Sequence, residues 1–227
     1  MEQLDTNQLA FDSKVALVTE SATVLGIDIA PVQRATVPNC RFQFDNVNWG
    51  WPRTPLSFDL IRGSKLLGNV NDWRRIFQGA YKTLMPGGLL ELYDTPFSYL
   101  FVSDQEAPSW KSVSQQAHEL GKRTNCSFSI AHGMYMHHME AAGFVDIKET
   151  WETTEVTEYV LHDVESMLRL SWYLQDMDKE AIRARLADWR SRLKSEAGNV
   201  NVQQYVPLFA PTDVLACLLY TSDAADD

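Results

Sequence analysis

The sequence predicts an α/β protein in which helices flank a mainly parallel sheet. Residues 58–94 carry the pattern most clearly, because two short apolar runs enclose a segment with helical periodicity. Two more apolar runs upstream each end in an acidic residue, and a turn of proline and glycine follows the helical segment. A strand, helix and strand in this order close right-handed onto a parallel sheet.

The first expected elements are short. Residues 14–19 fit either a strand or the end of an amphipathic helix. Residues 23–29 are β-branched and apolar, lead to Asp28 and predict a strand that ends in an acid. Residues 39–46 alternate apolar and polar side chains and predict a third strand, with Asp45 at its end.

The central unit follows. We expect strands over residues 58–61 and 89–93, joined by a helix that Asp72 caps at its first turn. The expected apolar face of this helix comprises Trp73, Ile76, Phe77, Ala80, Tyr81 and Leu84. The helix should stop at Pro86, Gly87 and Gly88, since proline cannot continue it and glycine accepts a left-handed turn.

The second half of the chain is expected to be more helical. Residues 111–122 and 135–142 predict helices, the latter ended by Gly143, and residues 144–150 predict a strand. Residues 160–197 predict mostly helix, with Ala181, Ile182, Leu186, Trp189 and Leu193 on one face and arginines on the other, which we interpret as a solvated face. Residues 204–209 predict a last edge strand, where Pro207 is tolerated.

The amino-acid composition and net charge indicate which kinds of binding partner to expect. The 227 residues suffice for one domain, and 45% hydrophobic with 22% charged residues are typical of a folded protein. A formal net charge of −10 disfavours nucleic acid and anionic membranes, so we expect a small-molecule or protein partner. Three scattered cysteines, no apolar run of membrane-spanning length and a polar, acidic start predict a cytoplasmic or nuclear location.

The strand-end acids are the first candidate site residues. In nucleotide-binding α/β folds, a carboxylate at this place accepts hydrogen bonds from both ribose hydroxyls of a ligand that lies across the strand ends. The alternative for Asp28 is a simple loop cap. Trp49 and Trp51 either line a ligand pocket or pack over the sheet edge, and packing is the more common role.

Other side chains give weaker indications. His132, His137 and His138 are close in sequence, but adjacent histidines on a helix point to different faces, so we predict no metal site. One of them, or His118, could serve as a general base, because imidazole titrates near neutral pH. The sequence contains no nucleophile elbow or phosphate-binding loop.

Five motifs in order resemble class I S-adenosylmethionine-dependent methyltransferases, which have a Rossmann-like parallel sheet. They are VLGIDIAP, CRFQFDN, SFDLIRG, LMPGGLLEL and MEAAGFVDI. More narrowly, the chain resembles the fungal group similar to the secondary-metabolism regulators of the velvet complex. The resemblance implies S-adenosyl-L-methionine as cofactor, with Asp28 and Ile29 at the ribose, Asp45 and Asn46 by the adenine, and Arg62, Gly63 and Ser64 bordering the methionine end.

The family's Gly-rich loop between its first strand and first helix is missing from this sequence. Only Gly26 precedes Asp28, and residues 13–28 align with the end of the family's first helix. We therefore expect one domain over residues 1–216 that lacks its first strand through truncation, mis-splicing or a wrong start. Residues 217–227 (CLLYTSDAADD) resemble a translated sequencing adapter, and we expect them to be read-through.

Two functions remain open at this point. The first is a methyltransferase of unknown acceptor, and whether the chain with this sequence is active is left open. The second is a non-catalytic member of the fold that acts through protein contacts. A dehydrogenase is a distant third, because no G-x-G-x-x-G sequence is present to hold a dinucleotide pyrophosphate.

Overall fold

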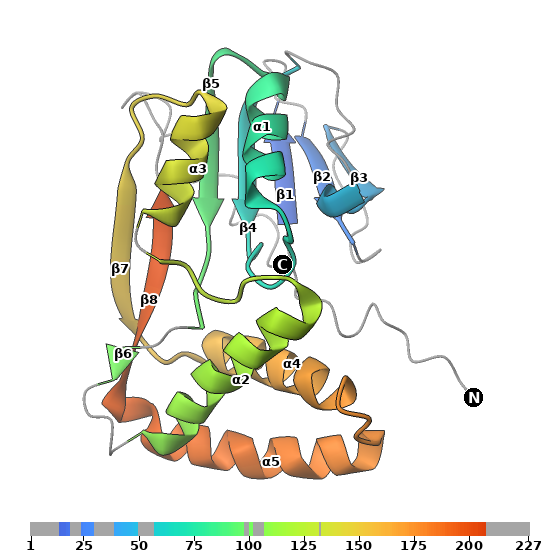
Figure 1. Cartoon of the computed structure of the whole chain (residues 1–227), viewed down its shortest axis with the longest axis vertical. Coiled ribbons are helices and arrows are strands. Elements are labelled where there is room, and N and C mark those ends of the chain that lie inside the picture. The colour runs from blue at the N-terminus through green and yellow to red at the C-terminus, as the bar shows by residue number, and fades with distance from the viewer. Residues whose placement is uncertain are drawn as a thin grey trace.

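The chain folds around a five-stranded sheet with strand order β3-β2-β1-β4-β5 (Figure 1). A computed structural model describes residues 14–18, 24–29, 39–49, 57–97, 100–101, 107–131 and 133–207. The strands of this sheet are β1 (Lys14–Val18), β2 (Val24–Asp28), β3 (Cys40–Phe44), β4 (Phe58–Ser64) and β5 (Leu84–Tyr93). Residues 217–227 and Trp51 lie outside the described residues.

The central strand β1 is antiparallel to both of its neighbours. It pairs antiparallel with β2, where Val18 faces Val24, and antiparallel with β4, where Lys14 faces Ser64. Residues 14–18 are therefore a strand and not the end of a helix. The pairs β2–β3 and β4–β5 are parallel, so four of the five strands share one direction, as predicted for a Rossmann-like sheet. The place of a first parallel strand is taken by a strand of opposite direction.

The predicted unit of strand, helix and strand is confirmed. Helix α1 (Trp73–Thr83) begins after Asp72, whose side chain accepts a hydrogen bond from the Arg75 backbone N–H. Its buried face is close to the predicted one, but Tyr81 is 48% exposed. Leu84 already pairs with Phe58 in β5, and a bulge at residues 85–88 follows. Pro86, Gly87 and Gly88 thus form an irregular start of the strand, with Gly87 at φ +82°.

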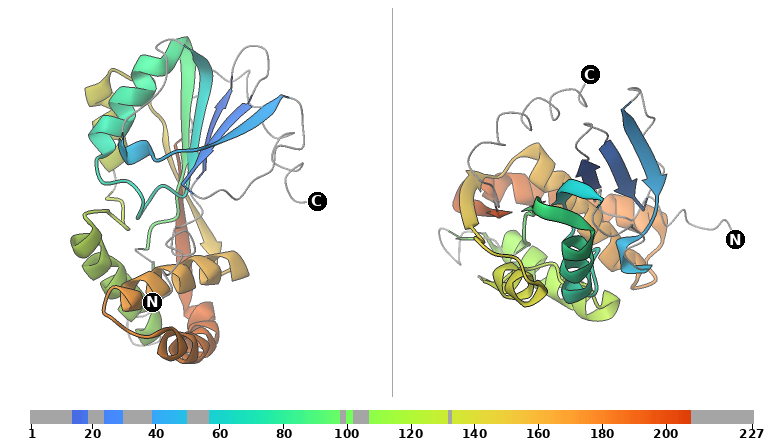
Figure 2. Two further views of the ribbon diagram at one scale, coloured as in Figure 1. Left: turned by 90° about the vertical axis from the view of Figure 1, so that its right-hand side faces the viewer. Right: turned by 90° about the horizontal axis from the view of Figure 1, so that it is seen from above.

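Helix α3 (Met134–Ala142) lies on the same face of the sheet as α1 (Figure 2). It ends at Gly143 as predicted, with a φ of +107°. The first apolar core lies between these helices and the strands, and it includes Ile27, Ile61, Leu90, Phe77 and Met139.

A second, three-stranded sheet has the order β6-β8-β7, and its strand β8 lies beside β5 (Figure 1). Its strands are β6 (Leu100–Phe101), β7 (Glu149–Glu155) and β8 (Val200–Pro207). Two predictions are wrong here. Residues 144–148 form turns and loop, so the predicted strand starts five residues late, after Asp146 has taken a φ of +54°. The last strand starts at Val200 and lies between two others, antiparallel to both, instead of at an edge.

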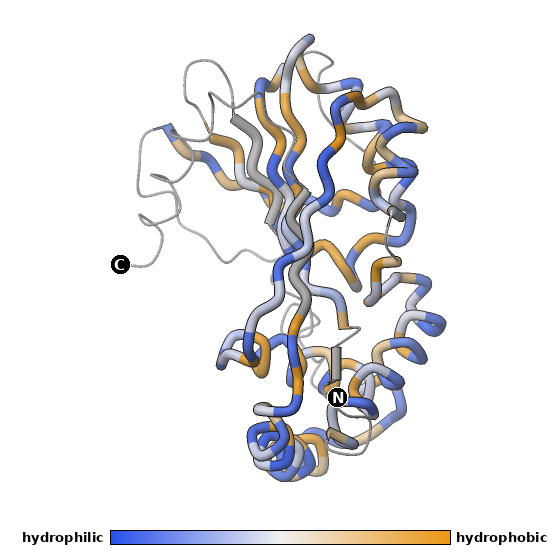
Figure 3. Tube along the Cα trace, turned by 90° about the vertical axis from the view of Figure 1, so that its left-hand side faces the viewer, coloured by the Kyte–Doolittle hydropathy of each residue, from blue (hydrophilic) through white to orange (hydrophobic). Residues whose placement is uncertain are grey.

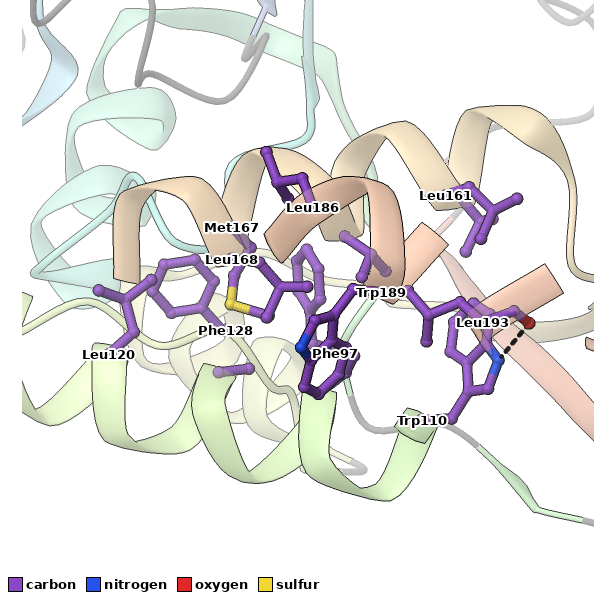
Figure 4. Packing of buried hydrophobic residues seen from close by; sticks show 14 of the residues in the cluster. Phe97, Trp110, Leu120, Phe128, Leu161, Met167, Leu168, Leu186, Trp189 and Leu193 are labelled. Atoms are coloured by element: carbon purple, nitrogen blue, oxygen red, sulfur yellow. Dashed lines mark hydrogen bonds between the residues drawn. The ribbon is translucent and has the colours of Figure 1, made fainter. Parts of the chain in front are cut away.

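Three helices form a separate layer beneath the carboxyl ends of β4 and β5, called here the helical module (Figure 1). They are α2 (Pro108–Thr124), α4 (Glu158–Tyr173) and α5 (Lys179–Glu196). The second apolar core holds this module together and includes Trp110, Trp172 and Trp189. Figure 4 shows Trp110 and Trp189 among the side chains of this core. The Trp110 indole N–H donates to the Leu193 carbonyl at 3.0 Å.

The faces of the helical module follow the sequence pattern. Polar and apolar segments alternate along these helices (Figure 3). In α5 the residues Ile182, Leu186, Trp189 and Leu193 are buried as predicted, whereas Ala181 is exposed. Part of the arginine face is engaged within the module, since the Arg190 guanidinium contacts the carboxylates of Glu158 and Glu165 on α4.

Candidate functional site

Two acidic residues meet at the carboxyl ends of the parallel strands β2 and β3. Asp28 is the last residue of β2 and faces Phe44, the last residue of β3, so Asp45 directly follows the end of β3. The Asp45 backbone N–H donates to the Asp28 carbonyl at 3.0 Å. Ile29 lies in the bend that follows β2 and is half-buried. The structure therefore brings together the two acids that the sequence singled out.

The loop after β3 is shaped by its own side chains. The Asp45 carboxylate accepts from the Asn46 N–H at 2.8 Å, and the Asn46 side-chain oxygen accepts from the Asn48 N–H at 2.9 Å. Such short-range bonds from aspartate and asparagine replace the ladder where a strand ends. Asp45 and Asn46 are thereby held in a turn that leads into a short 3₁₀ helix, η2 (Val47–Trp49).

Asn48 connects this loop to the loop after β4. Its side-chain N–H donates to the Asn69 carbonyl at 2.6 Å, and its side-chain oxygen accepts from the Asn71 N–H at 3.1 Å. The Arg75 guanidinium adds bonds to the carbonyls of Asn48 and Trp49. Sequence reasoning missed Asn48, because nothing in the order of residues shows that positions 48, 69 and 71 meet.

The third predicted group lies on β4. Arg62 faces Glu91 across the parallel ladder, and their side chains form an ion pair at 3.7 Å. Gly63 is closely packed, because a Cβ at this position would be 2.8 Å from terminal side-chain carbons of Leu66 and Leu92, which would have to shift. Ser64 ends the strand, so it alone of the three lies at the same edge as Asp28 and Asp45.

A third acid also lies at this edge, and sequence reasoning assigned it no role. Asp94 directly follows β5 and is completely buried. Its Oδ1 accepts from the backbone N–H groups of Leu66 and Leu67 at 2.7 and 3.1 Å, and its Oδ2 accepts from the Tyr135 hydroxyl at 2.9 Å. Burial raises the pKa of Asp94 to about 7, although the three hydrogen bonds act in the opposite direction. The same pattern of an apolar run ending in an acid marks this residue and Asp28.

Lys65 ties the edge to the helical module. Its side-chain Nζ lies 3.0 Å from the Asp163 Oδ1 and 3.6 Å from the centre of the Tyr159 ring, both on α4. Burial alone would lower the pKa of this ammonium, but the contacts with Tyr159 and Asp163 outweigh it and raise the pKa. Lys65 has a left-handed backbone, with φ +53°, so the chain turns sharply where β4 ends.

The aromatic and histidine candidates do not converge on the site. Trp49 is 73% exposed, so it neither packs over the sheet nor encloses a pocket within the described residues. His118 is exposed on α2, and the His138 ring stacks on Phe77 with centroids 6.3 Å apart. The side chain of His132 lies outside the described residues, among which no cluster of histidine, cysteine and acidic residues suits a metal ion.

No helix in the described part of the chain has the length and apolar character needed to cross a membrane.

Cys40 and Cys126 are free thiols. Burial raises the pKa of both, so neither carries the features of an activated nucleophile.

Comparison with known proteins supplies relatives but no family model that matches the chain. The methyltransferase pytC of Aspergillus terreus is 31% identical over 99 residues, which are 43% of this chain and 30% of that protein. The secondary metabolism regulator LAE1 of Hypocrea atroviridis is 27% identical over 137 residues, which are 57% of this chain and 39% of that protein. The matched part of the chain thus spans between 30% and 39% of the length of these relatives.

Solved structures overlap with the chain only loosely. A phosphoethanolamine N-methyltransferase 2 of Haemonchus contortus, solved with S-adenosylhomocysteine, gives a TM-score of 0.48 at 15% identity. The overlap covers 83% of this chain and 43% of that one. An overlap of this quality supports no functional argument, so the sequence relatives are the informative comparison. The predicted resemblance is confirmed at that level: the chain is related in sequence to fungal proteins named methyltransferase and secondary metabolism regulator.

Proposed function

We propose that the chain belongs to an S-adenosylmethionine-dependent methyltransferase that acts on a small-molecule or protein acceptor. The observation that carries the proposal is the meeting of Asp28 and Asp45 at the carboxyl ends of adjacent parallel strands. Ligands of open α/β sheets bind outside these strand ends. The sequence similarity to fungal proteins named methyltransferase and secondary metabolism regulator supports the same proposed function.

The described residues fit one half of the cofactor. Asp28 ends its strand at the place where a carboxylate can accept both ribose hydroxyls, and the fixed turn at Asp45 and Asn46 lies beside it for the adenine. Ser64, with Arg62 and Gly63 behind it on β4, is the proposed border of the methionine end. For that end the fit is incomplete, because the central strand runs antiparallel and brings its amino end to this edge.

Methyl transfer from this cofactor depends more on the relative positions of the two reactants than on proton transfer. When bound, the cofactor supplies a methyl group on a sulfonium, which a nucleophile of the acceptor takes up. The residues of this chain would orient the two partners, and correct orientation by itself lowers such barriers by several kcal/mol, roughly 7 to 11 in the best intramolecular cases. The helical module faces the edge from below and is the proposed wall on the acceptor side.

A non-catalytic role is the second candidate, and β1 favours it. A strand antiparallel to both neighbours cannot lead into the strand-to-helix turn that approaches the cofactor in this fold. A chain with this sheet would keep the two cores and the outer surface while binding the cofactor weakly. The cytoplasmic or nuclear location remains part of either proposal.

Calorimetry with S-adenosylhomocysteine tests the proposal on three proteins. We expect weak or undetectable binding by the chain itself. A version extended at its amino terminus by a parallel strand and a Gly-rich turn should bind. Asp28→Ala in the extended version should then weaken binding ten- to a hundredfold, equivalent to about 1.5 to 3 kcal/mol for hydrogen bonds to a charged acceptor.

Glu152→Ala is the control, since it removes an exposed acid of β7 and changes net charge equally. Tight binding by the chain itself would contradict the incomplete fit at the methionine end. Equal binding by the Asp28→Ala and Glu152→Ala versions would remove the role given to Asp28.

A further inference from the structure

Strand β3 forms one edge of the five-stranded sheet, and no strand of the described residues pairs with its outer side (Figure 1). Its register with β2 is uninterrupted from Cys40 to Phe44, so the strand has no bulge. It also contains no proline and no lysine. Bulges, proline and lysine are the features by which proteins commonly prevent an edge strand from pairing with another chain. The outer side of β3 is therefore an unprotected edge.

The backbone groups that face this edge belong to alternate residues of β3. The Asn39 carbonyl accepts a hydrogen bond from β2 at 2.7 Å, and the Asp45 N–H donates one to β2 at 3.0 Å. Odd-numbered residues therefore direct their N–H and C=O groups toward β2, because this direction alternates along a strand. It follows that the N–H and C=O groups of Cys40, Phe42 and Phe44 face away from β2, toward the open edge.

The side chains of these residues lie on the sheet face opposite helices α1 and α3. In β2, Ile27 is buried in the core between these helices and the strands, so Gly26 faces away from them. Gly26 is paired with Phe42, and a Cβ on Gly26 would be 2.4 Å from the Phe42 ring, which therefore lies on the opposite face. Phe42 and Phe44 are 40% and 58% exposed. One face of the open edge is thus aromatic and exposed to water.

We propose that β3 is a homodimer interface, at which the β3 strands of two copies of this chain pair antiparallel about a twofold axis at Phe42. In this register Phe42 lies opposite Phe42 of the second copy, and Cys40 lies opposite Phe44. The outward-facing residues thereby form hydrogen-bonded pairs, each of which exchanges two backbone hydrogen bonds. The same strand serves in both copies, so the assembly closes at two copies. This interface is independent of the proposed function.

The aromatic side chains determine this register. The Phe42 rings of the two copies lie opposite each other, and each Phe44 ring lies diagonal to the Phe42 ring of the second copy. Aromatic pairs across and diagonal to neighbouring strands stabilise a sheet, and these rings leave water when the strands pair. Centring the pairing on Cys40 or Phe44 would leave part of the short strand unpaired. The middle of β3 is therefore the favoured position of the twofold axis.

The charged residues of β3 favour a second copy of this chain as the partner. The Gln43 side-chain amide donates to the Asp45 carboxylate at 3.4 Å, so both side chains lie on the same face, which Arg41 shares by alternation. In the proposed register Arg41 lies opposite Gln43 of the second copy and diagonal to its Asp45. Diagonal neighbours have Cα atoms about 7 to 8 Å apart, which a long side chain can span. The twofold axis repeats this contact between opposite charges, and no like charges lie directly opposite each other.

Cysteine cross-linking tests the register on the full chain with Cys40, Cys126 and Cys217 replaced by serine. Phe42→Cys should form an intermolecular disulfide, because residues of a hydrogen-bonded pair have Cα atoms about 5.5 Å apart. Phe44→Cys is the matched control, since it makes the same exchange on the same face of the same strand. It should not cross-link, because the two copies of this position are offset by four residues, about 13 Å along the strand.

Sedimentation equilibrium tests the dimer itself, and the chain should show twice the mass of one copy. Phe42→Pro removes an N–H that β2 does not use, so the sheet should remain folded by circular dichroism while the dimer is lost. Arg41→Glu should weaken dimerisation by about tenfold, because it turns two attractive contacts into repulsive ones. Arg74→Glu makes the same charge change on the exposed side of α1 and should leave dimerisation unchanged.

Three results would overturn the proposal: a monomer at every concentration, a dimer that persists in folded Phe42→Pro, or equal cross-linking of Phe42→Cys and Phe44→Cys. Assemblies larger than a dimer would also overturn it, since pairing about a twofold axis occupies the edge completely. If Phe42→Pro unfolds, the comparison of the two cysteine variants decides. No cofactor takes part in these measurements, so a failed calorimetric test would reject the proposed function and leave the dimer unaffected.

Discussion

At the scale of single residues, the loop after β4 depends on backbone conformations that few side chains allow. Lys65 and Gly68 both have positive φ, at +53° and +78°. Two contacts stabilise the left-handed conformation of Lys65. Its ammonium forms an ion pair with Asp163, and its backbone N–H donates to the Tyr93 carbonyl. At Gly68 a side chain is excluded for a second reason, since a Cβ would overlap the ring of Phe128.

Gly68→Ala should therefore destabilise the protein more than Gly87→Ala. Both positions have a positive φ, but a Cβ on Gly87 would contact nothing within 4 Å. Gly87→Ala should cost about 1 to 2 kcal/mol from the left-handed backbone alone. Gly68→Ala should add about 1 to 3 kcal/mol for overpacking against Phe128. Urea unfolding of both variants checks the difference, and equal costs would contradict the close contact with Phe128.

At the scale of elements, β4 and α4 are joined by charged groups that lie mostly out of water. The side chains of Lys65 and Asp163 are 13% and 16% exposed, whereas those of Lys122 and Glu119 on α2 are 59% and 65% exposed. Ion pairs in water contribute little, and partial burial strengthens the attraction while adding a desolvation cost. The pair from β4 to α4 thus fixes the helical module against the edge that bears the candidate site.

A double-mutant cycle with Lys65→Met and Asp163→Asn measures this link. We expect a coupling free energy of about 1 to 2 kcal/mol, since the pair is a hydrogen-bonded charge contact with limited exposure. The matched cycle with Lys122→Met and Glu119→Gln should show no measurable coupling. Comparable coupling in the two cycles would mean that the contact with α4 does no more than a surface pair.

At the scale of the whole molecule, two apolar cores are arranged around one sheet edge. One core lies between the five-stranded sheet and helices α1 and α3, and the other lies inside the helical module. The direction of β1 determines which backbone reaches that edge. It brings Lys14 next to Ser64, where a parallel strand would have brought Val18.

Engineered disulfides can determine this direction. In a background with all three cysteines replaced by serine, Lys14→Cys with Ser64→Cys should form a cross-link, because paired positions have Cα atoms within disulfide range. Val18→Cys with Ser64→Cys should not, since four residues along a strand separate the positions by about 13 Å. Mass spectrometry under oxidising conditions reads the result, and the reverse pattern would show a parallel first strand.

Local signals in the sequence determined much of the fold. Asp72 caps α1 and Gly143 ends α3 as predicted, because a cap or a left-handed glycine acts on the few residues next to it. The strands β2, β3, β4 and β5 were also predicted from short apolar runs. Parallel neighbours then placed Asp28 and Asp45 side by side, since the carboxyl ends of such strands share an edge.

Only the tertiary structure decided the direction of β1, the late start of β7 and the central place of β8. Pairing between distant strands depends on partners that no local pattern reveals, and an antiparallel strand has the same apolar run as a parallel one. The same limit separates Asp28 from Asp94: both end a strand, but one is half-buried at the edge and the other fully buried against Leu66, Leu67 and Tyr135. The pKa of such an acid is set by burial, which depends on how the elements pack together.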